Sequence, residues 1–232
     1  MIERLGILFL HHHVDHIVKN NLRSIQLHNP DVFLASISTG EPLPGGYTIT
    51  PTPQLKWLHS TLHSRSSDRL VCSWYVQRRP HEICDKWWIV EWDVFCNMAI
   101  RDYYRSVWDF PFVVPSVRLP HREPEWHWFG QMEKEAKKEP QKMPAGYKPF
   151  MAGMVPFFCL ISEAALKATC SMLLENPLGV GNGEFRFATA ASRCGYPPCG
   201  FSPPNDQISC YPWKTLPKNP TIVHPVKFFV KF

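Results

Sequence analysis

The chain is 232 residues long, with 44% hydrophobic and 19% charged residues, a composition typical of folded globular proteins and not of disordered chains. Its 23 prolines exclude long helical bundles and coiled coils, because a proline inside a helix breaks it. The formal net charge is +5, but the basic excess is scattered along the chain, and we therefore expect no nucleic-acid partner.

No segment has the pattern of a membrane span or a secretory signal. The apolar run Leu5–Leu10 is short and is followed by three consecutive histidines, so we expect a soluble, cytoplasmic protein without a transmembrane segment. The eight cysteines lie mostly inside apolar stretches, which is typical of buried, reduced thiols. Cys194 and Cys199, with Cys210 nearby, could form a zinc or disulfide site. Their spacing lacks the second Cys-x-x-Cys or His-x-x-x-His pair of a typical zinc site.

The first forty residues predict a βαβ unit. Leu5–Leu10 is a continuous apolar run, as in a strand buried on both faces. Apolar residues between positions 14 and 25 then recur at helical spacing, and the helix should end before the first proline, since the residue preceding a proline disfavours the α conformation. A second apolar strand follows over Val32–Ile37. Such units form parallel sheets whose ligands bind at the carboxyl ends of the strands.

The middle of the chain repeats this pattern less regularly. A loop rich in glycine and proline covers residues 40–53. Hydrophobic periodicity then predicts, in order, a short helix over Leu55–Leu62, strands over Leu70–Val76 and Trp87–Glu91, a helix from Phe95 to Tyr103 and a strand over Val113–Val117. From residue 120 to residue 149 no period is sustained, so we expect a long surface loop, and such loops are often functional.

The last third of the chain contains three further predicted elements. An apolar strand covers Met154–Ile161, and Ser162 is positioned to cap the helix that follows it. A glycine-rich turn over residues 179–183 leads into a helix that begins near Glu184. The tail contains two apolar residues, Ile222 and Val223, directly before His224. We find no internal repeat and no linker, and we therefore expect one α/β domain with a mixed sheet over residues 1–232.

Two carboxylates, Glu91 and Asp93, directly follow the predicted strand Trp87–Glu91. Burying a carboxylate costs several kcal/mol (about 3–5 when its partner is missing), so a cation is expected nearby. Residues two apart at a strand end point to one side, where one carboxylate can bind a divalent metal and the other its hydration shell. The alternative is that Glu91 is a turn residue and Asp93 caps the next helix, and this segment alone favours neither.

Two other segments carry groups suited to the same chemistry. His224 is a usual type of metal ligand, and Lys227 follows three residues later, where its ammonium can neutralise a phosphate. Glu184 opens a helix, whose amino end stabilises a carboxylate that can then act as a general base. Taken singly, such a histidine is more often a core or surface residue, and such a glutamate an ordinary first-turn residue.

In this order along the chain, the three segments resemble the GT-A glycosyltransferases, which use nucleotide-sugar donors and a divalent metal. The resemblance implies a single GT-A (Rossmann-like) domain, with a mostly parallel mixed sheet flanked by helices. It implies that Glu91-Trp92-Asp93 stands for the D-x-D motif that binds metal and donor, with Glu91 in place of the usual first Asp. Glu184 then corresponds to the base of inverting members and His224 to a late metal ligand, and the ion is expected to be Mn²⁺ or Mg²⁺.

The resemblance also implies where the substrates bind. Residues 1–117 form the nucleotide-binding half and residues 118–232 the acceptor-binding half. The donor nucleotide is expected at the ends of the first two strands, beside His11 and the segment Ser38, Thr39 and Gly40. Arg78 and Lys227 are candidates for the diphosphate, although Arg78 with its neighbouring arginine equally fits a solvated face. Three successive histidines of an extended chain alternate in direction and cannot all bind one ion.

The aromatic residues Trp126 to Phe129 fit two interpretations equally well. Aromatic rings suit the apolar face of an acceptor sugar, and they also suit local packing in a loop. The chain has neither a G-x-G-x-x-G nor a P-loop motif, which argues against dinucleotide enzymes and P-loop ATPases. We therefore expect an enzyme, an inverting metal-dependent glycosyltransferase acting on a carbohydrate acceptor. A sugar nucleotidyltransferase and a non-catalytic binding protein with the same fold are the alternatives.

Overall fold

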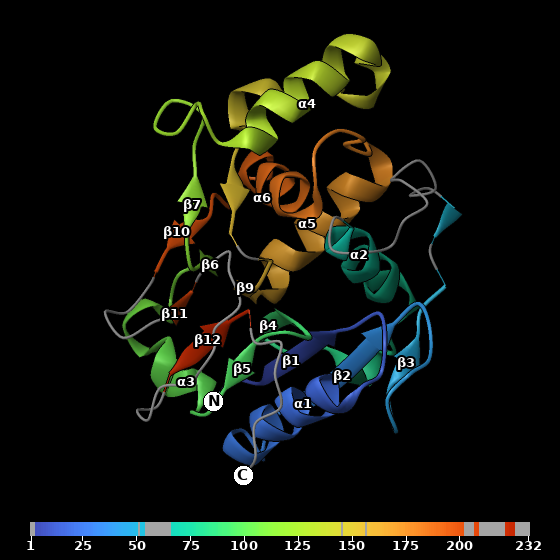
Figure 1. Cartoon of the computed structure of the whole chain (residues 1–232), viewed down its shortest axis with the longest axis vertical. Helices are drawn as coiled ribbons and strands as arrows, with labels where there is room; N and C mark the ends of the chain where they lie inside the picture. The colour runs from blue at the N-terminus through green and yellow to red at the C-terminus, as the bar shows by residue number, and fades with distance from the viewer. Residues whose placement is uncertain are drawn as a thin grey trace.

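The protein is built around one seven-stranded sheet (Figure 1). The structure, a computed structural model, describes residues 3–50, 52–53, 66–144, 146–155, 157–201, 207–208 and 221–225. The strand order is β10-β6-β9-β4-β1-β2-β3, and all neighbours are parallel except β9, which is antiparallel to both β4 and β6. In chain order the strands are β1 (Leu5–Leu10), β2 (Phe33–Ser38), β3 (Tyr47–Thr48), β4 (Lys86–Glu91), β6 (Phe112–Val114), β9 (Cys159–Ser162) and β10 (Cys199–Gly200).

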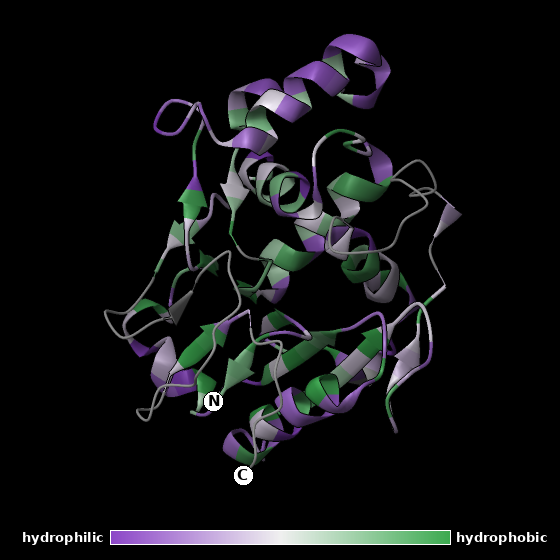
Figure 2. Ribbon diagram, in the orientation of Figure 1, coloured by the Kyte–Doolittle hydropathy of each residue, from purple (hydrophilic) through white to green (hydrophobic). Residues whose placement is uncertain are grey.

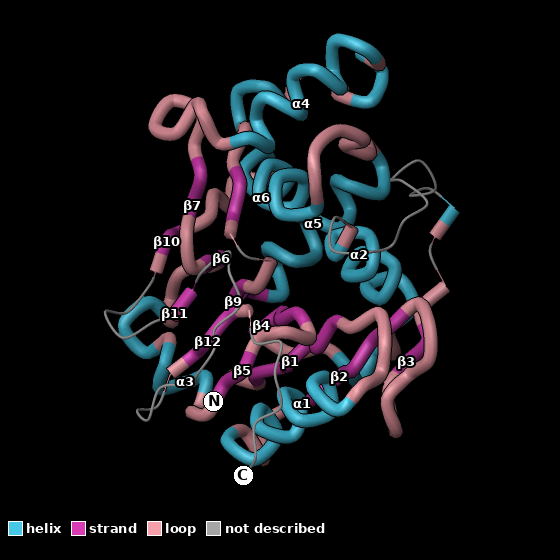
Figure 3. The backbone as a smooth tube through the Cα atoms, viewed as in Figure 1, coloured by secondary structure: helices cyan, strands magenta, loops and turns pink. Residues whose placement is uncertain are grey.

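Helices cover both faces of this sheet (Figures 1 and 3). One face carries α1, and the other carries α2, α5 and α6, while α4 lies at the far end of the molecule from α1. The helices are α1 (His16–His28), α2 (Ser67–Gln77), α3 (Ile100–Tyr103), α4 (His127–Lys138), α5 (Glu163–Glu175) and α6 (Gly183–Arg193). Short 3-10 turns lie at Pro80–Glu82, Arg105–Val107, Pro140–Lys142 and Lys148–Phe150. The expected α/β class with a mostly parallel mixed sheet is confirmed.

Each face of the sheet supports its own hydrophobic core. Successive side chains of a strand point to opposite faces. In β1, Leu8 packs into the core shared with α2, α5 and α6, whereas Ile7 packs into the core shared with α1. β4 alternates in the same way, with Trp87 in the first core and Trp88 in the second. Figure 2 shows the result: the inner strands are largely hydrophobic, and α4 is largely hydrophilic.

The βαβ unit predicted at the start of the chain is present. Asp15 caps α1, since its side chain accepts hydrogen bonds from the backbone N–H groups of Ile17 and Val18. The helix ends at His28, two residues before Pro30, for the reason the sequence indicates. Ser162 and Asn182 cap α5 and α6 through the N–H groups of Ala165 and Phe185.

Two small sheets lie outside the main one. β5 (Phe95–Cys96) pairs antiparallel with β12 (Ile222–His224), which pairs parallel with β11 (Gln207–Ile208). β7 (Val117–Arg118) pairs antiparallel with β8 (Gly153–Met154).

Four elements differ from the sequence-based expectation. The apolar run Leu70–Val76 lies in the helix α2, because a helix buried on several sides is as apolar as a buried strand. Residues 120–149 are not one loop, because α4 lies within them. The helix predicted from Phe95 to Tyr103 is the strand β5 followed by the short α3, and the strand predicted over Met154–Ile161 is divided into β8 and β9. The helix predicted over Leu55–Leu62 lies outside the described residues.

The seven described cysteines are free thiols, and five of them are buried. Burial raises the pKa of Cys96 to about 12, which keeps this thiol protonated and unreactive at neutral pH. Cys194 and Cys199 are among the free thiols, whereas Cys210 lies outside the described residues. Within the ranges given above, none of the helices is both long enough and apolar enough to cross a bilayer.

Candidate metal and catalytic site

The candidate site begins at the carboxyl end of β4. This strand lies between β1 and β9 in the centre of the sheet, and its last residue is Glu91. The chain then turns back, with the Val94 N–H donating a hydrogen bond to the Glu91 carbonyl at 3.1 Å. This turn brings the side chains of Glu91 and Asp93 to the same edge of the sheet. Glu91 is half-buried and Asp93 is buried.

Polar side chains of α1 hold the segment that follows the turn. The Asn21 amide donates to the Trp92 carbonyl at 2.9 Å, and the Ser24 hydroxyl donates to the Cys96 carbonyl at 2.6 Å. Asn29 donates to the Met98 carbonyl and accepts from the Ile100 N–H, at 3.2 and 2.9 Å. Asn21 and Ser24 lie on the buried side of α1, where the sequence contains polar residues among apolar ones, and Asn29 directly follows the last residue of the helix. They give the loop that carries Asp93 a defined backbone path.

The strand β12 brings the late histidine to the same place. Val223 pairs with Phe95, and the Thr221 N–H donates to the Asn97 side chain at 2.7 Å. The antiparallel register therefore directs His224 toward Asp93, and the distance between His224 Nε2 and Asp93 Oδ1 is 3.4 Å. Candidate ligand atoms of Glu91, Asp93 and His224 all lie within 4.8 Å of one another. We call these three residues the acidic cluster.

The acidic cluster has the chemistry of a divalent metal site. Two carboxylates held this close in a largely buried position repel one another, and a cation removes that cost. Carboxylate oxygens are the ligands that Mg²⁺ and Mn²⁺ prefer, and an imidazole nitrogen in the set favours a transition metal such as Mn²⁺ over Mg²⁺. Three protein ligands also leave coordination positions for a substrate. Among the described residues this is the only such group of potential ligands.

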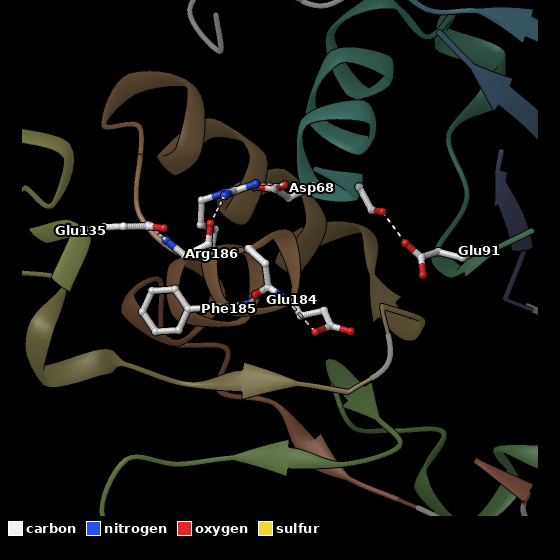
Figure 4. A network of polar contacts seen from close by, with 9 residues as sticks. Asp68, Glu91, Glu135, Glu184, Phe185 and Arg186 are labelled. Carbon is white, nitrogen blue, oxygen red and sulfur yellow. Dashed lines mark hydrogen bonds and ion pairs between the residues drawn. The ribbon is translucent and has the colours of Figure 1, made fainter. Parts of the chain in front are cut away.

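Glu184 lies on α6, near enough to His224 for the two side chains to interact electrostatically, and Figure 4 shows it together with Glu91. It is in the first turn of the helix, and its Oε2 accepts a hydrogen bond from the Asn182 amide at 2.8 Å. Burial raises the pKa of the Glu184 carboxyl to about 7, against the opposing effects of the Asn182 hydrogen bond and of the neighbouring His224 and Arg118. A carboxyl group that titrates near neutral pH is suited to accepting a proton.

The candidate nucleotide-binding residues lie at the ends of the neighbouring strands. Leu10 pairs with Glu91, so His11 follows β1 immediately beside the acidic cluster. His11 is buried, its Nδ1 lies 3.1 Å from the His13 carbonyl, and desolvation lowers its pKa. A Cβ added to Gly40 would lie 3.6 Å from the His12 carbonyl, which places the end of β2 against the end of β1.

The segment after β2 combines buried and exposed residues. Ser38 is buried and its hydroxyl accepts from the Gly40 N–H at 3.0 Å, whereas Thr39 is half-buried and Gly40 is exposed. The Trp92 ring lies edge-on to the His13 ring, with centroids 4.5 Å apart. Together these segments form the edge of the sheet at which parallel strands bind ligands.

Arg78 lies away from this edge. It follows α2, and its guanidinium forms a two-pronged ion pair with Glu163, which also accepts from the Trp87 indole. Trp87 is near the amino end of β4, opposite to the end that carries Glu91. Arg78 therefore ties α2 to α5, and we leave it out of the site proposed below. Lys227 lies outside the described residues.

The aromatic group Trp126 to Phe129, at the start of α4, packs inward at its first member. A Cβ added to Gly153 would overlap the Trp126 ring, and this ring lies edge-on to Phe129, with ring centroids 4.9 Å apart. His127 is exposed and Trp128 is half-buried, with ring centroids 4.4 Å apart. Trp126 thus follows the packing interpretation.

One polar residue of the site was not predicted from the sequence. The Ser67 hydroxyl donates a hydrogen bond to Glu91 Oε1 from the first residue of α2. A strand over the apolar run Leu70–Val76, as its composition predicts, leaves Ser67 outside any helix start. Ser66 and Ser67 preceding an apolar run with Asp68 in its first turn are the signal of a helix start that would have placed it.

Comparison with solved structures identifies the fold. The structure of mouse xyloside xylosyltransferase 1 is similar over 90% of this chain and 88% of that chain, with a TM-score of 0.52 and 14% sequence identity. The galactosyltransferase LgtC, solved with donor and acceptor sugar analogs, covers 87% of this chain and 75% of its own at a TM-score of 0.42 and 11% identity. The structure of the mannosyltransferase Ktr4p from S. cerevisiae is similar over 82% of this chain and 66% of that chain, with a TM-score of 0.41 and 10% sequence identity.

No protein-family model matches the chain, and no curated protein sequence matches it. The fold assignment rests on the xylosyltransferase comparison, since the other two TM-scores are lower. That likeness, with the seven-stranded mixed sheet, confirms the expected GT-A fold.

Proposed function

We propose that this protein is a metal-dependent glycosyltransferase that moves a sugar from a nucleotide-diphosphate donor to a hydroxyl group of a carbohydrate acceptor. The observation that carries the proposal is the acidic cluster, in which two carboxylates and an imidazole from distant parts of the chain meet at the ligand-binding edge of a GT-A sheet. A bound cation offsets the repulsion between the two carboxylates at this partly buried position.

Glu91, Asp93 and His224 would hold Mn²⁺ or Mg²⁺. When bound, the ion neutralises the negative charge that develops on the departing nucleoside diphosphate. The residues beside the cluster bind the donor: His11, Trp92 and the segment from Ser38 to Gly40 line the strand ends, and backbone groups there are held by the hydrogen bonds described above.

Glu184 is proposed as the general base. Its carboxylate accepts the proton of the acceptor hydroxyl while that oxygen attacks the anomeric carbon of the donor sugar. A single displacement of this kind inverts the configuration at that carbon. The pKa near 7 supports this role, because the carboxylate is then both substantially ionised and basic at neutral pH. The acceptor would lie beside Glu184, in the half of the chain from residue 118 to residue 232.

The proposal is tested by calorimetry and by product analysis. The purified protein is titrated with common nucleotide-diphosphate sugars in the presence and absence of Mn²⁺, and the expected result is binding heat that requires the ion. Donors that bind are then incubated with a panel of sugar acceptors, and NMR of the product reports the anomeric configuration. The proposal is wrong if no donor binds in a metal-dependent way. A retained configuration would remove the base role of Glu184 alone.

A further inference from the structure

We propose that Ser67 and Asp68, the first two residues of α2, are positioning residues that hold the acidic cluster and the helix of Glu184 in one arrangement. The inference rests on the proposed function, because it assigns these residues to the same site. Neither residue is expected to touch the substrate. Each holds a different part of the site, and the peptide bond between them fixes the two parts relative to one another.

Ser67 acts on the acidic cluster. Its hydroxyl donates a hydrogen bond to Glu91 Oε1, and Figure 4 shows this contact as the link between the start of α2 and the end of β4. A hydrogen bond to one carboxylate oxygen restricts rotation of the carboxyl group and so orients both of its oxygens. Groups that orient metal ligands in this way typically change metal affinity by about 10- to 100-fold when they are removed.

Asp68 acts on α6. Its two oxygens accept from Arg186 Nε and Nη2, both at 2.7 Å, and the side chains of Asp68 and Arg186 are 0% and 3% exposed. The remaining Arg186 nitrogen, Nη1, donates to the Gly181 carbonyl at 2.5 Å, and the Gly181 N–H donates to Glu135 at 2.8 Å. The pair is therefore fully desolvated and connects α2 to the turn that precedes Glu184 (Figure 4).

Gly183 allows the two helices to approach this closely. A Cβ added at this position would lie 2.9 Å from Asp68 Oδ1 and 3.2 Å from the Ser67 nitrogen. The atoms that such a Cβ would meet belong to the backbone and to a buried ion pair, so they cannot easily move aside. Glu184 is the next residue, so any displacement of the start of α6 from α2 displaces its carboxylate relative to the acidic cluster.

The role of Ser67 is tested by Mn²⁺ binding, measured by calorimetry on the whole chain. Ser67→Ala is expected to weaken binding by about 10- to 100-fold, and Ser67→Thr, which keeps the hydroxyl, is expected to restore most of it. Ser66→Ala is the matched control, because the Ser66 side chain is buried next to Ser67 and does not cap the helix. Unchanged Mn²⁺ affinity in Ser67→Ala, or an equal loss in Ser66→Ala, would overturn the inference.

The contact between the helices is tested by Gly183→Ala. Since Glu184 moves while the ligands of the ion stay in place, kcat is expected to fall at least about tenfold, with little change in Mn²⁺ affinity or in KM for the donor. Gly130→Ala is the control, because a Cβ there meets nothing within 4 Å. Equal kcat values for Gly183→Ala and the wild type would contradict the positioning role of this contact, and circular dichroism confirms that each variant is folded.

The outcomes separate this inference from the proposed function. If the wild type binds Mn²⁺ but transfers no sugar, the function is wrong, and the Ser67 measurements still decide the inference through affinity alone. If the wild type transfers sugar and the Ser67 and Gly183 variants behave like it, only the inference is wrong. A wild type that binds no Mn²⁺ removes both.

Discussion

Asp93 and His224 illustrate how an ordinary pair of side chains becomes a site through its surroundings. A carboxylate and an imidazole 3.4 Å apart are common on protein surfaces, but these two are about nine-tenths buried and share their position with Glu91. Removing such a pair from water is unfavourable unless a third charge or a ligand compensates. The arrangement therefore indicates a cation, and the consequences can be measured for single residues.

Replacing His224 is expected to weaken Mn²⁺ binding. The variant His224→Ala removes the only nitrogen ligand of the acidic cluster, and we expect affinity to fall at least tenfold, which corresponds to about 1.4 kcal/mol. Calorimetric titration with Mn²⁺ measures the loss. His121→Ala is the control, because His121 is exposed in a turn. Wild-type affinity in His224→Ala would exclude this residue as a ligand.

Deprotonation of Glu184 is expected to determine how kcat depends on pH on the acidic side of the pH–rate profile. Its pKa is about 7 in the metal-free protein, and a divalent cation bound nearby lowers it. Because a base must be deprotonated, kcat should fall as the pH decreases through this lowered value. Glu184→Gln should lower kcat by about 10²- to 10⁴-fold and abolish this pH dependence, while donor binding is retained. A pH series of initial rates for both proteins makes the measurement. An unchanged pH dependence in the variant would show that another group titrates.

The same carboxyl group links stability to pH in the metal-free protein. Because the folded pKa of Glu184 lies above the unfolded value of 4.5, the folded state binds more protons between these two values, and stability falls as the pH rises through them. Glu184→Gln, which has no such titration, should therefore melt at a higher temperature relative to wild type at pH 8 than at pH 4. Thermal melts at both pH values, without metal, give the comparison.

Among the elements, α1 shows how a helix can position a loop that lies beside it. Its buried face contains Asn21 and Ser24, Asn29 directly follows its last residue, and each of the three bonds to backbone groups of residues 92–100. Apolar residues alone would bury this face, but they would leave these backbone groups without partners. The polar residues that interrupt the hydrophobic pattern of α1 thus serve the loop that carries Asp93.

The effect of this arrangement on stability is measurable at Asn29. Asn29→Ala would leave the Met98 carbonyl and the Ile100 N–H without their present partner, and we expect a loss of about 1–3 kcal/mol in the free energy of unfolding. Gln26→Ala, an exposed change on the same helix, should alter stability by less than about 0.5 kcal/mol. Urea unfolding of both variants gives the two values, and equal losses would contradict the assigned role.

In the molecule as a whole, the site joins segments that are far apart in the sequence. β4, α6 and β12 contribute residues from positions 91 to 224, and the small sheet of β5 and β12 brings the last segment across to the first. Binding of an ion at this junction stabilises only the folded chain, in which the three segments meet.

Mn²⁺ is therefore expected to stabilise the fold. At a concentration one hundred times the dissociation constant it should add about 2.7 kcal/mol to the free energy of unfolding, since the unfolded chain does not assemble the site. Thermal melts of the wild type with and without Mn²⁺ measure this, and Asp93→Asn should show little of the increase. The same shift in Asp93→Asn would place the bound ion elsewhere in the protein.

The sequence by itself determined the local features. The limits of β1 and α1, the cap at Ser162, and the strand ending at Glu91 follow from hydrophobic runs, capping residues and prolines, which act within a few residues of one another. The order of Glu91-Trp92-Asp93, Glu184 and His224 also sufficed to anticipate the GT-A fold.

Only the tertiary structure decided what depends on distant contacts. The run Leu70–Val76 lies in a helix that packs against α5 and α6 and leaves Val76 exposed, an arrangement that apolar composition does not encode. Three contacts of this kind join residues that are separated by 24 to 118 positions. Ser67 bonds to Glu91, Arg78 pairs with Glu163, and Asp68 pairs with Arg186. Such contacts are set by how whole elements pack together, and hydrophobic periodicity within one segment carries no information about them.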